Sequence, residues 1–393
     1  MTTPKLRFKE FDGGWVLKKI GEIASKVGSG STPRGGAEAY TDEGIIFIRS
    51  QNVNNDQLLL DDVVFIPETT HKKMSGSKVF ANDILLNITG ASIGRSCVVP
   101  SVFSEGNVNQ HVCIIRTPND DPIFVQSFLS SENGQNHIQS KQVGGGREGL
   151  NFQAIRSIDL AIPSKSEQTK IASFLSVVDE KISQLTQEHE LLSQYKQGMM
   201  QKLFSQQLRF KVDDGSEFGE WEEQTLGKIV NFHNGKRIPL SETERQNRQG
   251  TYRYFGASGV IDYVDGYLFD GQYILIGEDG ANILTRSTAL AFVVQGQFWV
   301  NNHAHIFQSK SGNNFFLAAY LESLNYEKFN SGTAQPKLNL ENLKKVPVLY
   351  PCLEEQTKIA NFLSAIDQKI EVVAQQIEQA KQWKKGLLQQ MFV

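Results

Sequence analysis

A long segment of this chain occurs twice, and the two copies are separated by a constant 188 residues. Residues 150–204 recur without a gap at 338–392, and the hexapeptide Glu-Gln-Thr-Lys-Ile-Ala stands at 167–172 and again at 355–360. From residue 167 to 204, 19 of the 38 positions are identical in the second copy. A constant offset over such a length indicates an internal duplication. Any fold of this chain must therefore contain two related units.

Each copy predicts a long helix with one apolar stripe. Apolar positions advance by alternating fours and threes, which is the seam of a two-stranded coiled coil. The first seam consists of Ile171, Leu175, Val178, Ile182, Leu185, His189, Leu192, Lys196, Met199 and Leu203. The second consists of Ile359, Leu363, Ile366, Ile370, Val373, Ile377, Ala380, Lys384, Leu387 and Met391. Ordinary amphipathic core helices are the alternative, but helices of about 38 residues, roughly 57 Å, exceed the usual length.

The ends of the helices and the connections between them predict their direction. Pro163 and Pro351 mark the two helix starts, and Ser164 followed by Glu167 fits a capping box. Only a short stretch separates the first helix from the second unit, so we expect the helices to run antiparallel. The tetrapeptide Leu-Arg-Phe-Lys occurs at 208–211, just after the first helix, and also at 6–9. The copy at 6–9 predicts that the N-terminal segment follows the second helix in space, as in a circularly repetitive molecule.

Composition limits the class of protein. With 393 residues, 39% hydrophobic and 10% aromatic, the chain can bury more than one core. The net charge is −3 and no segment is basic overall, so a nucleic-acid surface would have to arise from local arrangement. Three cysteines without metal-ligand spacing favour a reducing compartment. Without a leader or an apolar run of membrane length, we expect a cytoplasmic protein with no membrane contact.

The segments outside the helices predict an α+β fold with two β-rich domains. Strands are expected at 44–48, 78–88, 110–116, 272–276, 289–294 and 298–307, and short helices at 121–131 and 314–326. The first of these helices opens with Asp-Pro, which is typical of a helix start. We therefore expect a domain at 1–163, a helix at 164–206, a second domain at 207–351 and a second helix at 352–393.

Two unlike domains related by an approximate two-fold axis match a DNA site in two halves, because the duplex backbone has two-fold symmetry. Arginine recognises guanine, and asparagine or glutamine recognises adenine. The candidate contacts in the first domain are Thr32, Arg34, Lys72, Lys73, Arg95, Asn109, Gln110, His111, Lys141 and Arg147. Those in the second domain are Lys236, Arg237, Arg248, Arg253, Arg286, Asn301, Asn302, His303 and Lys337. For each of them, a solvated charge or a turn-capping amide is the alternative interpretation.

Motifs for catalysis are missing from the sequence. No two prolines are adjacent, so the Asn/Asp-Pro-Pro-aromatic motif of amino-methyltransferases is absent, and no Gly-Lys precedes Ser or Thr as in a phosphate-binding loop. Residues 179–181 and 367–369 resemble part of a nuclease site, but on a helix they indicate solvated faces or ion pairs. The sequence predicts a binding protein without a metal site, catalytic residues or a cofactor. A protein-interaction scaffold and, less favoured, a restriction endonuclease that acts alone are the alternatives.

The repeated hexapeptide followed by Phe-Leu-Ser and Asp, the Leu-Arg-Phe-Lys and Trp openings, and residues 83–90 resemble the specificity subunit of type I restriction-modification systems. The resemblance implies two target recognition domains for a split DNA site, with helices that set the gap and bind two modification subunits. It further implies that those subunits use S-adenosylmethionine to methylate adenine, flipping it out of the stack, while restriction subunits use ATP and Mg²⁺. Thr32 and Pro33 resemble the family's Gly-Lys-Thr-Pro loop, and 109–111 its Asn-Gln-His segment. The second domain departs from both motifs, with Lys236, Arg237 and Pro239 in the first place and Asn-Asn-His at 301–303 in the second.

Overall fold

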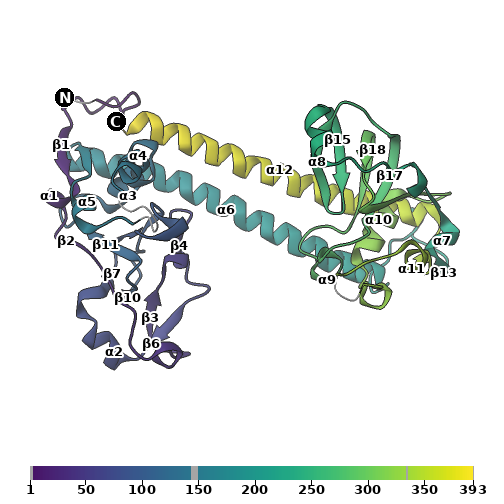
Figure 1. The fold of residues 1–393 in the computed structure, drawn as a ribbon, viewed down its shortest axis with the longest axis horizontal. Coiled ribbons are helices and arrows are strands. Elements are labelled where there is room, and N and C mark those ends of the chain that lie inside the picture. The colour runs from purple at the N-terminus through teal and green to yellow at the C-terminus, as the bar shows by residue number, and fades with distance from the viewer. Residues whose placement is uncertain (1–2, 143–148, 333–334, 393) are drawn as a thin grey trace. The chain divides into compact units, whose positions relative to one another are not determined.

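The computed structural model describes residues 3–142, 149–332 and 335–392, and its fold is α+β (Figure 1). Internal contacts divide the chain into two units. Unit 1 comprises Met1–Thr186 and Gln375–Val393, and unit 2 comprises Gln187–Ala374. Each unit contains one β-rich domain and one stretch of each long helix, as the duplication predicts.

Unit 1 contains two four-stranded sheets and a two-stranded ribbon. The ribbon joins β1 (Val16–Lys19) to β12 (Asp159–Ile162). One sheet has the order β6 (Val64–Ile66), β3 (Ile45–Ile48), β10 (Glu105–Val108), β7 (Lys78–Phe80), and the other β2 (Lys26–Ser29), β11 (Val112–Arg116), β8 (Ile84–Asn87), β9 (Ser96–Val98). A hairpin of β4 (Val53–Asn54) and β5 (Gln57–Leu58) and helices α1 (Ile20–Ile23), α2 (Glu68–Lys73), α3 (Pro122–Ser130), α4 (Glu132–Ser140) and α5 (Phe152–Arg156) complete it.

Unit 2 contains one six-stranded sheet and a similar ribbon. The sheet has the order β14 (Val230–Phe232), β19 (Ala304–Ser309), β17 (Phe269–Gly277), β18 (Ala291–Val300), β15 (Gln249–Gly256), β16 (Gly259–Val264). The ribbon joins β13 (Glu222–Thr225) to β20 (Pro347–Tyr350). The short helices are α7 (Leu226–Ile229), α8 (Glu242–Asn247), α9 (Asn282–Thr285), α10 (Asn314–Ser323) and α11 (Leu340–Lys344).

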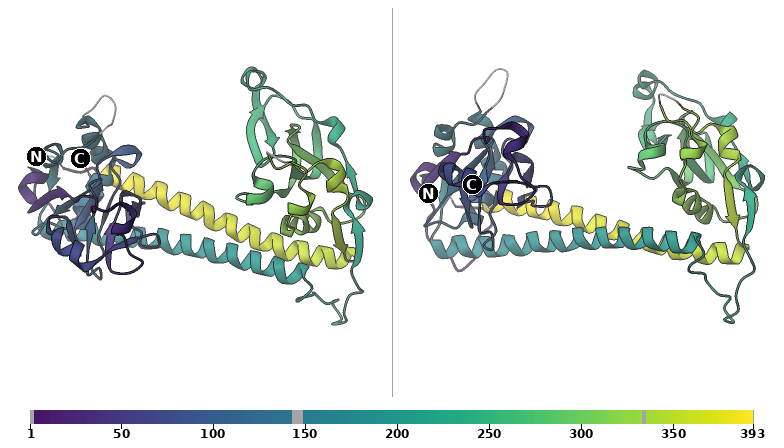
Figure 2. Two further views of the ribbon diagram at one scale, coloured as in Figure 1. Left: turned by 60° about the horizontal axis from the view of Figure 1, so that its bottom comes forward. Right: turned by 90° about the horizontal axis from the view of Figure 1, so that it is seen from below.

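The two long helices are α6 (Lys165–Phe204) and α12 (Leu353–Met391), each an unbroken ribbon in Figure 2. Every seam position predicted from the sequence is buried or half-buried. In unit 1 the start of α6 packs on the end of α12, with Leu175 and Leu387 in one core. In unit 2 the end of α6 packs on the start of α12, with Leu203 and Leu363 in one core. The predicted antiparallel pairing is therefore confirmed.

The lysine that interrupts each seam has an acidic partner on the other helix. In unit 1, Lys384 Nζ lies 2.6 Å from Asp179 and 2.9 Å from Asp56 in the β4–β5 turn. In unit 2, Lys196 Nζ lies 2.5 Å from Asp367. These pairs occupy equivalent positions in the repeat. The resemblance of 179–181 and 367–369 to a nuclease element thus reflects ion pairs between helices, one of the two interpretations that the sequence offered.

The repeated hexapeptide also has a structural role. The carboxylate of Glu167 is buried, accepts hydrogen bonds from Arg7 at 2.7 and 2.8 Å, and accepts one from the indole of Trp15. Glu355 binds Arg209 and Trp221 in the same way. The capping-box prediction is therefore only half right: the Glu167 amide donates to Ser164 Oγ at 3.4 Å, but its carboxylate binds Arg7 and Trp15.

The predicted circular repetition appears in the hydrogen bonds at the helix ends. The amide of Leu208 donates to the carbonyl of Lys202 near the end of α6. The amide of Leu6 donates to the carbonyl of Gln390, the equivalent residue of α12. The N-terminal segment therefore follows α12 in space as residue 208 follows α6 in sequence.

Two predicted strands are interrupted by turns. The segment 298–307 was expected to be one strand, but β18 ends at Val300 and β19 begins at Ala304. The intervening turn is held by the side chain of Asn301, which accepts the amide of His303. The segment 78–88 is likewise broken, because Asn82 adopts a φ of 67° and Asp83 caps the turn by accepting the amide of Phe80. Side-chain hydrogen bonds to nearby backbone interrupt both runs.

Candidate nucleic-acid interface

A three-residue turn connects two strands at the same place in each unit. In unit 1 the turn 109–111 joins β10 to β11, and in unit 2 the turn 301–303 joins β18 to β19. The strand that enters each turn pairs in parallel with an earlier strand, β3 or β15. The strand that leaves pairs antiparallel with β8 or β17, in matching register. The two turns are therefore structurally equivalent.

One hydrogen bond is the same in both turns. Asn109 Oδ1 accepts the amide of His111 at 3.0 Å, and Asn301 Oδ1 accepts that of His303 at 2.8 Å. The Nδ1 atom of His111 lies 2.6 Å from the hydroxyl of Thr89, the second residue after β8. The bonds to Asn109 and Asn301 fix the backbone of each turn. The turn of unit 2 therefore matches the Asn-Gln-His turn of unit 1, although its sequence departs from the family motif.

The partner of the second histidine differs. His303 Nδ1 lies 2.9 Å from Asp279, which follows β17 as Thr89 follows β8. Bridge pairs join Thr89 to Gly149 and Asp279 to Lys337, so a fourth segment reaches each turn at the equivalent position. A hydroxyl in unit 1 is thus replaced by a carboxylate in unit 2.

Each turn presents polar groups to solvent. Gln110 is exposed, and its amide accepts from Thr32 at 2.5 Å and lies 3.0 Å from His111 Nε2. In unit 2, Asn302 and His303 are exposed. A side-chain amide and an imidazole on a fixed backbone can donate to and accept from the edges of bases in a DNA groove. The arrangement suits recognition rather than bond chemistry.

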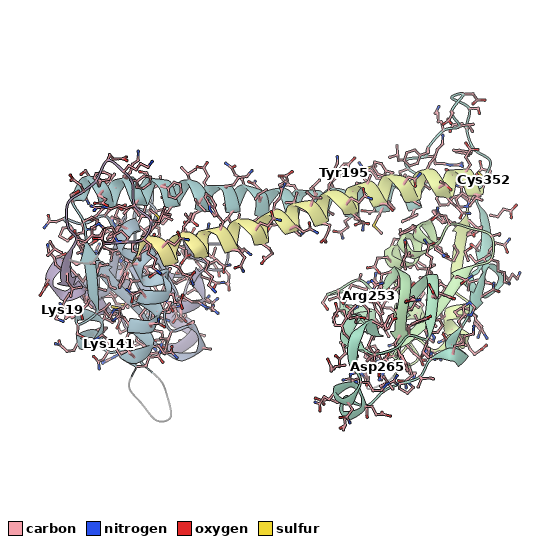
Figure 3. The ribbon with its side chains drawn as sticks, turned by 90° about the horizontal axis from the view of Figure 1, so that it is seen from above. Lys19, Lys141, Tyr195, Arg253, Asp265 and Cys352 are labelled. Carbon is pink, nitrogen blue, oxygen red and sulfur yellow. The ribbon has the colours of Figure 1, made fainter. Side chains whose placement is uncertain are left out.

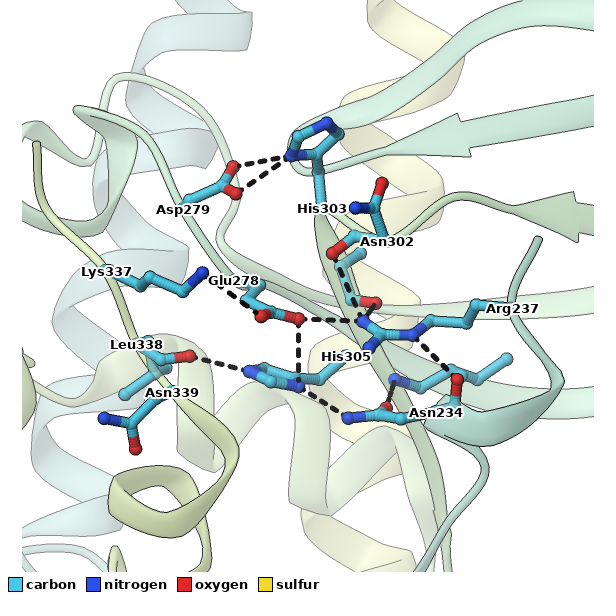
Figure 4. Close-up of polar contacts among 12 residues, drawn as sticks. Asn234, Arg237, Glu278, Asp279, Asn302, His303, His305, Lys337, Leu338 and Asn339 are labelled. Carbon is cyan, nitrogen blue, oxygen red and sulfur yellow. Dashed lines mark hydrogen bonds and ion pairs between the residues drawn. The ribbon is translucent and has the colours of Figure 1, made fainter. Parts of the chain in front are cut away.

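A polar cluster supports the turn of unit 2 (Figure 4). Arg237 donates to Glu278 at 2.8 Å and to the carbonyls of Ala304 and Asn302 at 2.6 and 3.4 Å. Glu278 itself follows β17 directly. Glu278 and Asp279 were not predicted from the sequence, because direct contacts to DNA were expected mainly from cationic and amide side chains. Their position immediately after a predicted strand was the available signal.

His305 is the buried member of this cluster. Its Nδ1 lies 2.8 Å from the amide of Asn234, and its Nε2 lies 2.7 Å from the carbonyl of Leu338. The side-chain oxygen of Asn234 accepts a hydrogen bond from the amide of Ile306, so the side-chain NH₂ group of Asn234 donates to Nδ1 of His305. The proton of the imidazole is therefore on Nε2. Burial lowers the pKa of His305. This histidine is therefore a neutral structural residue on β19.

The structure brings together only part of the predicted site. Thr32, Asn109, Gln110 and His111 meet in unit 1, and Arg237, Asn301, Asn302, His303 and Lys337 meet in unit 2, with Lys236 exposed beside Arg237. Arg147 lies outside the described residues. Arg34 and Arg95 are exposed, Lys141 follows α4, and Lys72 and Lys73 lie on α2. The nearest partner of Lys72 is Glu68 on the same helix.

Three predicted arginines of unit 2 bind their own domain. Arg248 lies 2.8 Å from Asp265 and stacks over Trp299. Arg253 donates to a backbone carbonyl of β18, and Arg286 lies 2.8 Å from Glu322. Figure 3 labels Arg253 and Asp265 within the domain of unit 2. These contacts are typical of guanidinium groups that stabilise a fold.

Within residues 3–142, 149–332 and 335–392, no group of three or more His, Cys, Asp or Glu side chains could hold a metal ion. None of the helices in that part of the chain combines the length and apolarity needed to cross a lipid bilayer. Cys97 and Cys113 are buried thiols, and burial raises the pKa of Cys113 to about 12. Cys352 is exposed just before α12 (Figure 3).

Comparisons with known proteins agree with this architecture. The type I restriction modification DNA specificity domain matches residues 12–194 and again 219–382. A putative type I restriction enzyme specificity subunit from Haemophilus influenzae is 36% identical over 40% of this chain and 39% of its own length. The putative MjaX specificity subunit of Methanocaldococcus jannaschii is 21% identical over 98% of this chain and 94% of its own.

A solved structure shares the fold. The type I restriction-modification S subunit from M. genitalium superimposes with a TM-score of 0.65, covering 100% of this chain and 99% of that one at 18% identity. The domain match covers both halves of the repeat. The chain therefore belongs to the family of DNA specificity subunits of type I restriction-modification systems, the non-catalytic component of these enzymes.

Proposed function

We propose that each unit recognises one half of a bipartite site in double-stranded DNA, and that the turns 109–111 and 301–303 contact the bases. The observation that carries this proposal is the equivalence of the two turns, which have the same backbone arrangement but differ in their exposed side chains. A shared backbone gives both units the same approach to DNA. Different side chains give the two half-sites different sequences.

We further propose that α6 and α12 set the gap between the half-sites. Inserting four residues after Gln187 lengthens α6 by about 6 Å, close to two base pairs of DNA. The half-sites should remain the same while the gap between them grows. Mapping methylated adenines in cells that carry this variant tests the proposal, and an unchanged gap would contradict it.

The helices are also the proposed binding surface for two modification subunits. Tyr195 and Trp383 occupy equivalent positions of the repeat and are exposed, as are Leu191 and Val372. Exposed apolar side chains of this size are typical of protein interfaces. The equivalent positions of Tyr195 and Trp383 favour two copies of one partner.

The remaining partners follow from the proposed role in the enzyme. The modification subunits would supply S-adenosylmethionine and the adenine methylation, and restriction subunits would supply ATP- and Mg²⁺-dependent translocation and cleavage. We propose that this chain binds no cofactor itself. The complex would act in the cytoplasm, where the DNA is. We also propose that the two recognition domains span 1–163 and 207–351.

Alanine substitutions at the exposed amides test the recognition turns. In the complex with the modification subunits, Gln110→Ala should relax the half-site of unit 1, and Asn302→Ala that of unit 2, each by about ten- to hundredfold at the base concerned. Selection from a DNA library randomised in both halves measures this. Gln297→Ala, an exposed amide on β18, is the matched control.

Two outcomes would contradict the proposal. If both alanine variants keep the wild-type preference in both halves, the turns do not contact bases. If the complex with its partners shows no salt-dependent binding to DNA, the chain serves as an interaction scaffold instead.

A further inference from the structure

We infer that Arg237, although it lies in a loop beside the recognition turn, is a positioning residue that holds the turn 301–303 and does not contact DNA. This inference rests on the proposed function of unit 2. It assigns to Glu278 the matching role of fixing the guanidinium. It also reverses the simplest expectation for an arginine at a DNA-binding site, which is contact with guanine or phosphate.

The directions of the Arg237 hydrogen bonds carry the inference. Its Nε donates to the carbonyl of Asn234 at 3.0 Å, and its Nη1 donates to Glu278 and to the carbonyls of Ala304 and Asn302. The side chain is only 14% exposed. Asn302 is the central residue of the turn, and Ala304 is the first residue of β19. One guanidinium therefore ties the loop after β14 to both the turn and the strand that leaves it (Figure 4).

The charge of Arg237 is also already compensated. Glu278 is 16% exposed, and its other oxygen lies 3.7 Å from Lys337. A guanidinium that donates to a phosphate must reach it, and a carboxylate that already accepts from the same group competes with the phosphate. To reach DNA, Arg237 would have to leave a half-buried carboxylate and three carbonyls without their donor. The free energy lost in this way exceeds the free energy gained from one new contact with DNA.

Unit 1 holds its turn by a different device. Thr32 occupies the loop after β2, as Lys236 and Arg237 occupy the loop after β14. Its hydroxyl donates to the side chain of Gln110 rather than to the backbone of the turn. In unit 1 the backbone of the turn is bound from the same loop by the amide of Gly30, which donates to the carbonyl of Asn109. The Arg237–Glu278 pair therefore belongs to unit 2.

Substitution of Glu278 separates the two roles of Arg237 by the sign of the effect. If Arg237 contacts DNA, Glu278→Gln removes a competing anion from the interface, and DNA binding becomes tighter. If Arg237 positions the turn, the same change loosens the guanidinium, and discrimination falls about tenfold at the half-site of unit 2. The measurement uses the complex with modification subunits, equilibrium DNA binding and selection from a library randomised in both halves.

Arg237→Met gives the second readout. We expect relaxed preference at several base pairs of one half-site, an unchanged second half-site, and an unchanged slope of log Kd against log salt. Lys236→Ala, the neighbouring exposed lysine, is the matched control for a loss of cationic charge. Two results for Arg237→Met would overturn the inference. One is a slope reduced by about 0.9, the value for one lost phosphate contact, and the other is relaxation confined to a single base pair.

Protein folding is checked independently of this site. The half-site read by unit 1 must keep its wild-type profile in every variant, because that unit contains neither residue. If Arg237→Met does not fold, Glu278→Gln alone decides, and tighter binding in that variant would overturn the inference. If wild-type selection shows no preference in either half, the proposed function fails rather than the role of Arg237.

Discussion

The two recognition turns show how one backbone can be held by different side chains. In unit 1 the exposed amide of Gln110 is bound by Thr32 and lies against His111. In unit 2 the backbone of Asn302 is bound by Arg237, and within the described residues its amide group makes no hydrogen bond. A preorganised amide reduces the entropy lost on binding, whereas an unrestrained one can adapt to its partner. The units therefore share geometry and differ in how strongly they fix the recognising group.

The contacts that join each domain to the start of its long helix differ less than the turns do. Glu167 and Glu355 bind an arginine and a tryptophan in the same arrangement, and both carboxylates are buried. Gln168 and Gln356 each accept the amide of a residue that caps a helix, Asp121 or Asn313. The duplication thus retains the joint between each domain and its helix, while the turns diverge.

The largest expected effect tests whether the contacts of Glu167 and Glu355 contribute equally to the stability of their units. Glu167→Ala and Glu355→Ala each leave a half-buried arginine without its carboxylate, so each should destabilise its own unit by about 3–5 kcal/mol. Hydrogen exchange of peptides from each unit measures the local free energy of opening. Glu354→Ala, an exposed neighbour, should cost under about 0.5 kcal/mol. Unequal losses would show that the two joints are not energetically equivalent.

The helix ion pairs should be less equal. Lys384 is 13% exposed and has two carboxylate partners, Asp179 and Asp56, whereas Lys196 is 28% exposed and has Asp367. Burial raises the pKa of Asp179, so its charge is costly without a partner. Lys384→Met should cost about 2–3 kcal/mol, and Lys196→Met under about 1 kcal/mol.

Urea unfolding followed within each unit measures both losses. Combining Lys384→Met with Asp179→Leu should recover part of the loss, because the second change removes the unpaired charge. Equal costs in the two units would mean that the contact with Asp56 contributes nothing.

Exchanging the histidine partners should change specificity more than stability. Asp279→Thr gives unit 2 the hydroxyl that unit 1 has at Thr89, and Thr89→Asp makes the reciprocal change. Each should alter discrimination at its own half-site by about tenfold, because the acceptor that orients the imidazole changes. Methylation mapping measures the result. Altered preference in the opposite half-site would contradict independent recognition by the two units.

The smallest expected effect is a difference in acid sensitivity. His305 is neutral when folded because burial lowers its pKa, although the Glu278 charge opposes this and Arg237 and Lys337 support it. Between its lowered folded pKa and the ordinary value of about 6.5, the unfolded state binds more protons, so unit 2 loses stability as the pH falls from about 6.5 through the folded pKa. Unit 1 has Cys113 at the equivalent position, which stays neutral there.

Hydrogen exchange at pH 7.5 and about pH 5.5 compares the two units. Unit 2 should weaken more than unit 1, and His305→Gln should reduce the difference. If the variant keeps the full acid sensitivity, another group in the cluster is responsible.

Much of the fold could be predicted because the sequence repeats. The spacing of the seam residues predicts both long helices, and Asp121 before Pro122 predicts the start of α3, where its side chain accepts the amides of Ile123 and Phe124. The turn 301–303 was hidden because Trp299, Val300 and Ile306 continue a strand-like pattern across it. The side chain of Asn301 outweighs that pattern, and only its contacts show this.

The amino-acid sequence by itself determined the duplication, the two amphipathic helices, the α+β class and the Asn-containing motifs at 109–111 and 301–303. These features depend on spacing along the chain, and periodicity records spacing directly. Tertiary structure alone decided that Lys384 meets Asp179, that Glu167 binds Arg7 rather than its own helix start, and that Arg237 points inward to Glu278. A long charged side chain can reach many partners, and packing of segments far apart in sequence selects one of them.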